Sequence, residues 1–274
     1  MFLIDSSHDL ETSQASKPEL ITEKITQPRR LSRISRMRLL SMLEKSMAAG
    51  SSTIISGRAG AGKTALAVDF AHHCRRPVAW YKVDAPDADP RIFFRYLIRS
   101  IQEQRPGFGT ESVIPLVEAA ELDLIPWLAE AFVYELAEGE SANPLLIVIE
   151  DLHLVSDSEW LMLFFGRLLP LLPSEVHVLI TSRSLPPAPL WRMRSKQSLV
   201  VVDEGTLAFT RPEAVTLFES YGLSSEQASI ALDHTHGRAA ALDDFASYLQ
   251  QSDHKSAGKL WRSEIGNTSA VRRA

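Results

Sequence analysis

Residues 57–64 combine glycine, lysine and threonine at a spacing suited to binding phosphate. They match the complete G-x-x-x-x-G-K-[ST] pattern. Glycines permit a tight turn whose backbone N–H groups point at phosphate oxygens, and a following helix adds its positive dipole end. Lys63 is expected to reach the β- and γ-phosphates, and the Thr64 hydroxyl to bind Mg²⁺. The predicted nucleotide-binding residues are Gly57, Arg58, Ala59, Gly60, Ala61, Gly62, Lys63, Thr64 and Ala65.

An acidic pair closes the most apolar run of the chain. Glu150 and Asp151 follow Leu145–Ile149 directly. One carboxylate near a phosphate loop can hold Mg²⁺, directly or through water, and the other can orient or deprotonate an attacking water. We assign Glu150 to the metal shell together with Thr64, and Asp151 to water activation, and the reverse assignment stays open. The alternative is an acidic strand end that faces solvent.

A third polar cluster, Thr181, Ser182 and Arg183, follows another apolar segment. The guanidinium of Arg183 can reach a γ-phosphate, and we include it with the acidic pair among the predicted catalytic residues. Thr181 or Ser182 can hydrogen-bond the same group. Alternatively, Arg183 pairs with a surface carboxylate. His153 lies two residues past Asp151, and we interpret it as a structural residue.

Five apolar segments alternate with helical patterns. This predicts an α/β fold: a P-loop NTPase three-layer sandwich with a five-stranded, mainly parallel sheet, followed by a small all-α domain. The carboxyl ends of parallel strands meet at one edge, so the three polar clusters should lie together there. The predicted strands are residues 52–56, 77–84, 145–149, 176–181 and 199–203, and the predicted helices are 31–47, 64–71, 89–104, 111–138, 157–172 and 210–250.

Composition narrows the class of protein. The 274 residues are 45% hydrophobic and carry a net charge of −5, so no global basic field favours nucleic acid. A single cysteine, Cys74, excludes an intrachain disulfide and fits a reducing compartment. We find neither a secretion signal nor an apolar run of the ~20 residues that span a bilayer, so we expect a cytoplasmic protein without a membrane partner. The predicted divisions are a flexible segment 1–24, an ATPase domain 25–205, a helical domain 206–252 and a flexible tail 253–274.

The ordered set of motifs resembles the nucleotide-binding domain of the STAND class of signal-transduction ATPases. Within that class it is most similar to the ATPase part of the large LuxR-type, MalT-like transcriptional regulators. The resemblance spans residues 20–245. The matching stretches are residues 25–30, 57–64, 78–84, 89–97, 147–154, 181–187 and 207–210.

The resemblance implies a function. In that family ATP binds between the sheet domain and the helical domain, the ADP form is inactive, and ATP with an inducer permits self-association and activation of transcription. It implies ATP or ADP with Mg²⁺ as cofactors, and a protein partner or further copies as partners in the ATP state. Carried over by residue, Lys63 and Thr64 bind phosphate and Mg²⁺, Glu150 and Asp151 form the acidic pair, and Arg183 senses the γ-phosphate.

The chain differs from the family pattern in two places. The helical domain usually carries a Gly-x-Pro-like signature, whereas residues 236–242 contain no proline. The family also places a winged helix, a helical-repeat sensor and a DNA-binding helix-turn-helix after this region, and residues 246–274 are too few for any of them. We therefore expect a fragment or a stand-alone ATPase module that does not bind DNA by itself.

Three hypotheses follow from the motifs. The first is an ATP-binding regulatory switch with slow hydrolysis, acting in transcriptional regulation. The second is a stand-alone P-loop ATPase that couples hydrolysis to work on an unidentified substrate. The third is a scaffold that binds no nucleotide. The lack of a recognisable second-substrate site favours the switch, and intact Lys63 and Thr64 argue against the scaffold.

Overall fold

The computed structural model describes residues 20–29, 32–50, 52–119, 121–138, 143–184 and 199–251. Within these residues one sheet contains five strands: β1 (Ser52–Ser56), β2 (Val78–Lys82), β3 (Leu145–Glu150), β4 (Val176–Ser182) and β5 (Leu199–Val202). Their order is β2-β3-β4-β1-β5, and every neighbouring pair is parallel. Four predicted strands agree with the observed ones to within one residue at each end, and the strand predicted over residues 77–84 is longer than β2. The α/β class and the parallel sheet are therefore confirmed.

Helices fill the connections between strands. Over the same residues they are α1 (Met37–Ala48), α2 (Lys63–His73), α3 (Pro90–Gln102), α4 (Val113–Ala119), α5 (Ile125–Ala137), α6 (Glu159–Leu168), α8 (Glu204–Leu207), α9 (Arg211–Glu219), α10 (Ser225–Thr235) and a last helix over residues 239–251. Short 3₁₀ helices are η1 (Thr22–Ile25), η2 (Ala85–Ala88), η3 (Leu122–Leu124), η5 (Leu152–Val155) and η6 (Leu169–Leu171). No helix built from the described residues is long and apolar enough to cross a membrane.

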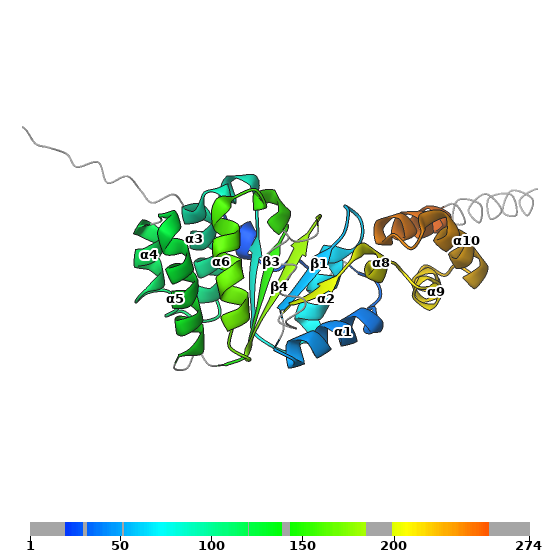
Figure 1. The fold of residues 1–274 in the computed structure, drawn as a ribbon. Helices are drawn as coiled ribbons and strands as arrows, with labels where there is room; N and C mark the ends of the chain where they lie inside the picture. The colour runs from blue at the N-terminus through cyan, green and yellow to red at the C-terminus, as the bar shows by residue number, and fades with distance from the viewer. Residues whose placement is uncertain are drawn as a thin grey trace, which may run out of the picture.

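The central strands are buried on both faces, as their continuous apolar sequences predict. Along β3, Leu145, Ile147 and Ile149 belong to one hydrophobic core, whereas Leu146 and Val148 belong to another. The first core also contains side chains of α3, α5 and α6, and the second contains side chains of α1 and α2. Figure 1 shows these two groups of helices on opposite sides of the sheet. The larger domain is therefore a three-layer sandwich.

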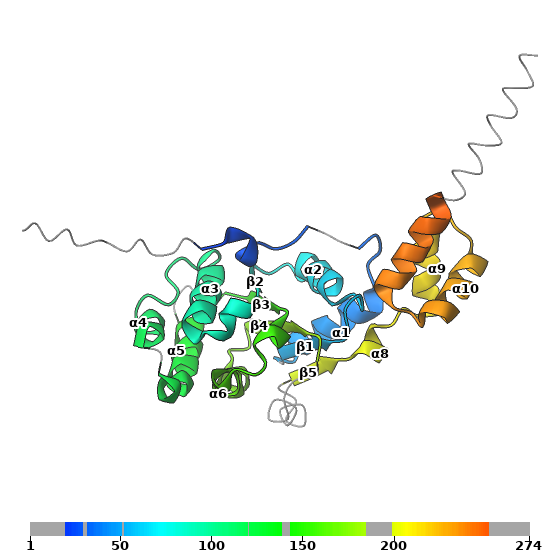
Figure 2. The same cartoon turned by 90° about the horizontal axis from the view of Figure 1, so that it is seen from above.

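The last helices have a hydrophobic core of their own. Phe209, Leu217, Phe218 and Leu242 are buried in it, and they come from α9, the last helix and the link before α9. Figure 2 shows this small domain at one end of the molecule, beyond β5 and α8. The predicted all-α domain after the sheet is confirmed.

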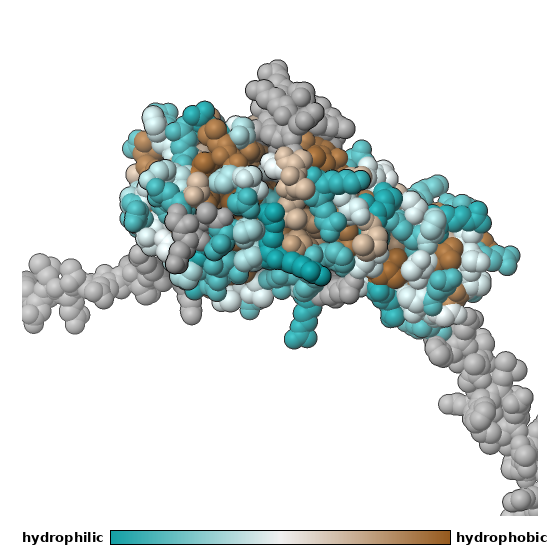
Figure 3. Space-filling model, turned by 90° about the horizontal axis from the view of Figure 1, so that it is seen from below, coloured by the Kyte–Doolittle hydropathy of each residue, from teal (hydrophilic) through white to brown (hydrophobic). Residues whose placement is uncertain are grey.

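Seen from below, hydrophobic residues are exposed mainly over the larger domain (Figure 3).

Helix α1 begins later than its sequence predicts. The expected helix starts at residue 31, whereas α1 starts at Met37, whose side chain is exposed. Ile34, three residues before Met37, packs against the core of the small domain. This contact requires a non-helical backbone between the two domains, so tertiary packing outweighs the helical spacing of the apolar residues.

Part of the segment expected to be flexible packs against the larger domain. The Lys24 ammonium lies 2.5 and 2.6 Å from the two carboxylate oxygens of Asp87, and 4.1 Å from the ring centroid of Tyr96. The Lys24 and Asp87 side chains are only 11% and 0% exposed. Asp87 also accepts a hydrogen bond from the Asp84 N–H, at 2.7 Å. These donors compensate the burial of its charge. Residues 1–19 and 253–274 lie outside the described residues.

Replacing Asp87 by alanine should lower the free energy of unfolding by about 3–5 kcal/mol, because Lys24 would remain as a buried charge without a partner. Urea unfolding followed by circular dichroism measures this loss. The control Arg99→Gln breaks an exposed pair with Glu103, at 2.7 Å, and should cost less than about 1 kcal/mol. Equal losses in the two variants would contradict the importance of burial.

Candidate functional site

The loop between β1 and α2 has the conformation that its glycines permit. Gly62 has φ = 89°, in the left-handed region, and α2 begins at the next residue. The N–H of Gly57 donates to the Ser182 carbonyl at 3.2 Å, which joins the start of the loop to the end of β4. Because α2 begins directly after the loop, the N–H groups of its first turn face the loop, where an anion would be stabilised.

Lys63 lies folded against the same loop. Its ammonium donates to the carbonyl oxygens of Gly57 at 2.7 Å and Arg58 at 3.1 Å. Burial lowers the pKa of Lys63, the carboxylate of Asp151 opposes this shift, and the guanidinium of Arg183 adds to it. The charges of the loop, the acidic pair and the third cluster therefore act on one another.

Thr64 and Glu150 lie in direct contact. The Thr64 hydroxyl donates to Oε1 of Glu150 at 2.5 Å, and Glu150, the last residue of β3, is only 4% exposed. A hydroxyl and a carboxylate oxygen side by side are the donors that Mg²⁺ accepts, and Mg²⁺ commonly uses one or two protein ligands with substrate phosphates. In the described parts of the chain, no group of three or more His, Cys, Asp or Glu could hold a metal. Thr64 and Glu150 therefore fit a Mg²⁺ ion whose remaining ligands would include phosphate oxygens.

Asp151 turns the chain away from the sheet. It has φ = 60°, an uncommon value for a residue other than glycine, and its N–H donates to the Thr181 hydroxyl at 3.0 Å. Nδ1 of His153 lies 3.7 Å from Oδ1 of Asp151, too far for a hydrogen bond. Burial lowers the pKa of His153, Asp151 opposes the shift, and the charges of Arg183 and Lys63 add to it. Burial and the nearby positive charges therefore favour the neutral form of this imidazole.

Arg183 completes the set of residues selected from the sequence. It follows β4 directly and is exposed. Its charge lowers the pKa of both Lys63 and His153, so it lies within electrostatic range of both. The structure thus brings the phosphate loop, the acidic pair and Arg183 together at one edge of the sheet.

Glu204 is a site residue that the sequence analysis missed. It is the first residue of α8, its Oε2 accepts from the N–H of Arg58 at 3.1 Å, and its Oε1 accepts from the Arg58 Nε at 2.9 Å. These hydrogen bonds from Arg58 lower the pKa of Glu204. An available signal was its position, because Asp203 and Glu204 follow β5 just as the other polar clusters follow their strands.

The small domain contacts the phosphate loop through its last helix. The N–H of Ala240 donates to the Gly60 carbonyl at 2.9 Å. A Cβ on Gly60 would lie 3.0 Å from the Ala240 methyl group, and a Cβ on Gly62 would lie 2.9 Å from that of Ala239. These alanines occupy the stretch where the family pattern has proline. Small side chains on both partners permit this close approach.

Two cavities lie between the loop and the small domain. One has a volume of 190 Å³ and opens beside Gly62 and Ala65, with walls from Arg33, Phe209 and Asp243. The other has a volume of 310 Å³, and among the residues that line it are Arg58, Glu204, His234, His236 and Arg238. Both domains are therefore needed to form either cavity.

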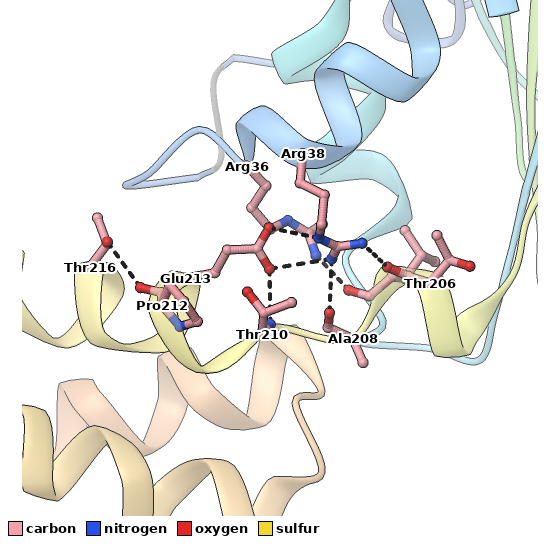
Figure 4. A network of polar contacts seen from close by, with 9 residues as sticks. Arg36, Arg38, Thr206, Ala208, Thr210, Pro212, Glu213 and Thr216 are labelled. Atoms are coloured by element: carbon pink, nitrogen blue, oxygen red, sulfur yellow. Dashed lines mark hydrogen bonds and ion pairs between the residues drawn. The ribbon is translucent and has the colours of Figure 1, made fainter.

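A cluster of arginines joins the two domains, and we call Arg36, Arg38 and Glu213 the interdomain cluster (Figure 4). Arg36 donates to the Leu207 carbonyl at 2.6 Å, and burial lowers its pKa to about 10, so it is charged at neutral pH. Arg38 pairs with Glu213 at 3.3 Å. Glu213 also accepts from the N–H of Thr210 at 2.9 Å and so caps α9. The cluster holds the link between the domains against α1.

The variant Glu213→Gln should loosen the link between the domains while keeping the cap of α9, because an amide oxygen still accepts from Thr210. Loss of about 1 kcal/mol in the pair with Arg38 should raise hydrogen-exchange rates of amides 206–211, 213 and 214 about fivefold. The matched control is Glu226→Gln, in the first turn of α10. Unchanged exchange in Glu213→Gln, or the same change in both variants, would contradict a clamping role.

Comparison with known proteins agrees with the resemblance found in the motifs. The chain is 31% identical over 254 residues to the HTH-type transcriptional regulator MalT of Cronobacter sakazakii, and 31% identical over 240 residues to that of Serratia proteamaculans. The alignments cover 88% and 85% of this chain but 27% and 26% of the relatives, so it spans about a quarter of their length.

Similar solved structures include a Walker-type ATPase of Pyrococcus abyssi. It is 15% identical, with a TM-score of 0.49, and the match covers 87% of this chain and 75% of that one. The family model described as Nephrocystin 3, N-terminal, matches residues 40–183. Because that match includes more than half of the 274 residues, this chain belongs to the nephrocystin 3 N-terminal family.

Proposed function

We propose that this chain is an ATP-binding regulatory module of the STAND, MalT-like type, in which the bound nucleotide controls the contact between the sheet domain and the helical domain. The observation that carries the proposal is the direct contact between the phosphate loop and the small domain at Gly60 and Ala240. Any ligand that changes the loop also changes this contact. The 31% identity with regulators named MalT supports a role in transcriptional regulation.

The phosphate groups are assigned to the loop. Backbone N–H groups of Gly60, Gly62 and the first turn of α2 would stabilise the negative charge of a phosphate. Lys63 is held beside the loop by two carbonyl oxygens, and an incoming phosphate gives its ammonium a charged partner in their place. Thr64 and Glu150 would hold Mg²⁺, which neutralises charge on the phosphates when it is bound.

Hydrolysis is assigned to the acidic pair and its neighbours. Asp151 orients or deprotonates the attacking water, and its backbone is fixed by the bond to Thr181. Arg183 contacts the γ-phosphate and so distinguishes ATP from ADP. We expect slow turnover, because a switch must stay in one nucleotide state long enough for a partner to respond.

The nucleoside is assigned to the cavity beside Gly62 and Ala65, which at 190 Å³ would widen to hold it, because small-molecule sites usually measure about 300–1,000 Å³. Phe209 offers an aromatic face, and Asp243 offers a carboxylate that accepts from hydroxyl or amino groups. Adenine rather than guanine rests on the resemblance. Because Arg33 and Phe209 come from different parts of the chain, a bound nucleoside would join the two domains.

The remaining assignments are part of the same proposal. The ATPase domain comprises residues 25–205 and the helical domain residues 206–252. We infer that the module acts in the cytoplasm, contacts a protein partner or further copies in the ATP state, and makes no contact with DNA through this chain. The contacts of Ala239 and Ala240 with the loop support a helical domain whose surface becomes exposed or covered according to the bound nucleotide.

Lys63→Ala should weaken ATP and ADP binding about 30-fold or more, because charged hydrogen bonds to phosphate contribute about 2 kcal/mol or more. Titration calorimetry with and without Mg²⁺ measures this loss. The control Lys45→Ala removes an exposed lysine near the end of α1 and should leave affinity unchanged. Equal affinities in all three proteins would exclude the phosphate loop as the nucleotide site.

Asp151→Asn should slow ATP hydrolysis by about 10²- to 10⁴-fold, the usual contribution of a general base, while ATP affinity changes little. Single-turnover release of phosphate measures the rate. Asp157→Asn is the matched control, since Asp157 is an exposed carboxylate in the same loop. Wild-type hydrolysis above about 1 s⁻¹ without a partner would instead favour a stand-alone ATPase.

A further inference from the structure

A cavity of 440 Å³ lies between α3 and α4, beside the start of the described chain. It shares no lining residue with the two cavities at the phosphate loop. Its volume falls in the range of small-molecule sites, about 300–1,000 Å³. Ile98, Ile114 and Leu20 supply apolar surface, and Arg91 and Arg95 lie along its rim. We call this feature the arginine groove.

The arginines of the groove repeat every four residues along α3. Arg91, Arg95 and Arg99 therefore lie on one face of the helix, and all three are exposed. Arg99 pairs with Glu103 at 2.7 Å. Among the residues that the structure describes, the side chains of Arg91 and Arg95 have no hydrogen bond or ion pair. Like charges four residues apart repel each other, so a bound anion would relieve an unfavourable interaction.

We propose that the arginine groove binds a small anionic molecule with an apolar body. A carboxylate or phosphate group would accept hydrogen bonds from Arg91 and Arg95, whose planar guanidinium groups match such oxyanions. The apolar body would cover Ile98 and Ile114. Glu118 lines the same groove and repels a second negative group, so the site fits one anionic head rather than a polyanion.

The groove also touches the segment that leads to the nucleotide site. Leu20 lines the groove, and the N–H of the next residue, Ile21, donates to the Tyr96 hydroxyl at 3.1 Å. Further along, Ser32, Arg33 and Arg36 line the cavity beside the phosphate loop. A ligand in the groove therefore contacts one end of a segment whose other end bounds the proposed nucleoside site. An effect of such a ligand on the nucleotide site rests on the proposed function, whereas the binding of the ligand in the groove does not.

The test uses 8-anilinonaphthalene-1-sulfonate, an anionic dye with an apolar body, and the neutral dye N-phenyl-1-naphthylamine. Fluorescence titration is done on the full chain with saturating MgATP, and repeated on Lys63→Ala. We expect saturable 1:1 binding of the anionic dye in both proteins. The double variant Arg91→Gln/Arg95→Gln should bind it about tenfold more weakly or worse, because two charged hydrogen-bond donors are lost.

The control is Arg75→Gln/Arg76→Gln, which makes the same change in net charge just after α2 and should keep the wild-type affinity. Equal affinities in the two double variants, tighter binding of the neutral dye, or displacement of the anionic dye by MgATP would each overturn the proposal. Because the groove arginines are exposed, circular dichroism should show an unchanged fold. Loss of nucleotide binding in Lys63→Ala with dye binding retained would separate the groove from the nucleotide site.

Discussion

The parallel pairing of β4 with β1 and β3, and of β1 with β5, positions nearly every polar group of the candidate site. Ser56 lies beside Ser182 in the register of β1 and β4, so the phosphate loop starts where β4 ends. On the other side, β5 runs parallel to β1 and delivers Glu204 to Arg58. An antiparallel neighbour would place its carboxyl end at the opposite edge of the sheet. The strand directions therefore decide which charges meet.

A second constraint is the space around the phosphate loop. The small domain approaches so closely that any Cβ on Gly60 or Gly62 would meet an alanine methyl group. The contact is made by a carbonyl oxygen of the loop and a helix N–H, so it engages no N–H group of the loop. Small residues on both partners thus serve two purposes, since they permit domain contact without closing the anion site.

Sequence patterns identified the residues that end or follow a strand within a known motif. The loop, Glu150, Asp151 and Arg183 all have this character, and the fold places them where the strand ends predict. Glu204 follows the same rule without a motif and was missed. Arg36 had no such signal, because its partner is the carbonyl of Leu207, 171 residues away, and a backbone carbonyl has no sequence signature. The start of α1 was misjudged for a similar reason, since Ile34 packs in the other domain.

The sequence alone determined the alternation of strands and helices, the parallel sheet and the chemistry of its carboxyl edge, because apolar periodicity and the phosphate-loop spacing are local properties. Only the tertiary structure decided how the small domain lies against the loop, which residues bound the two cavities there, and that arginines of α3 border a separate groove. Those features depend on contacts between segments far apart in the chain. They involve backbone carbonyls, methyl groups and cavities, none of which has a pattern that can be read from residue types.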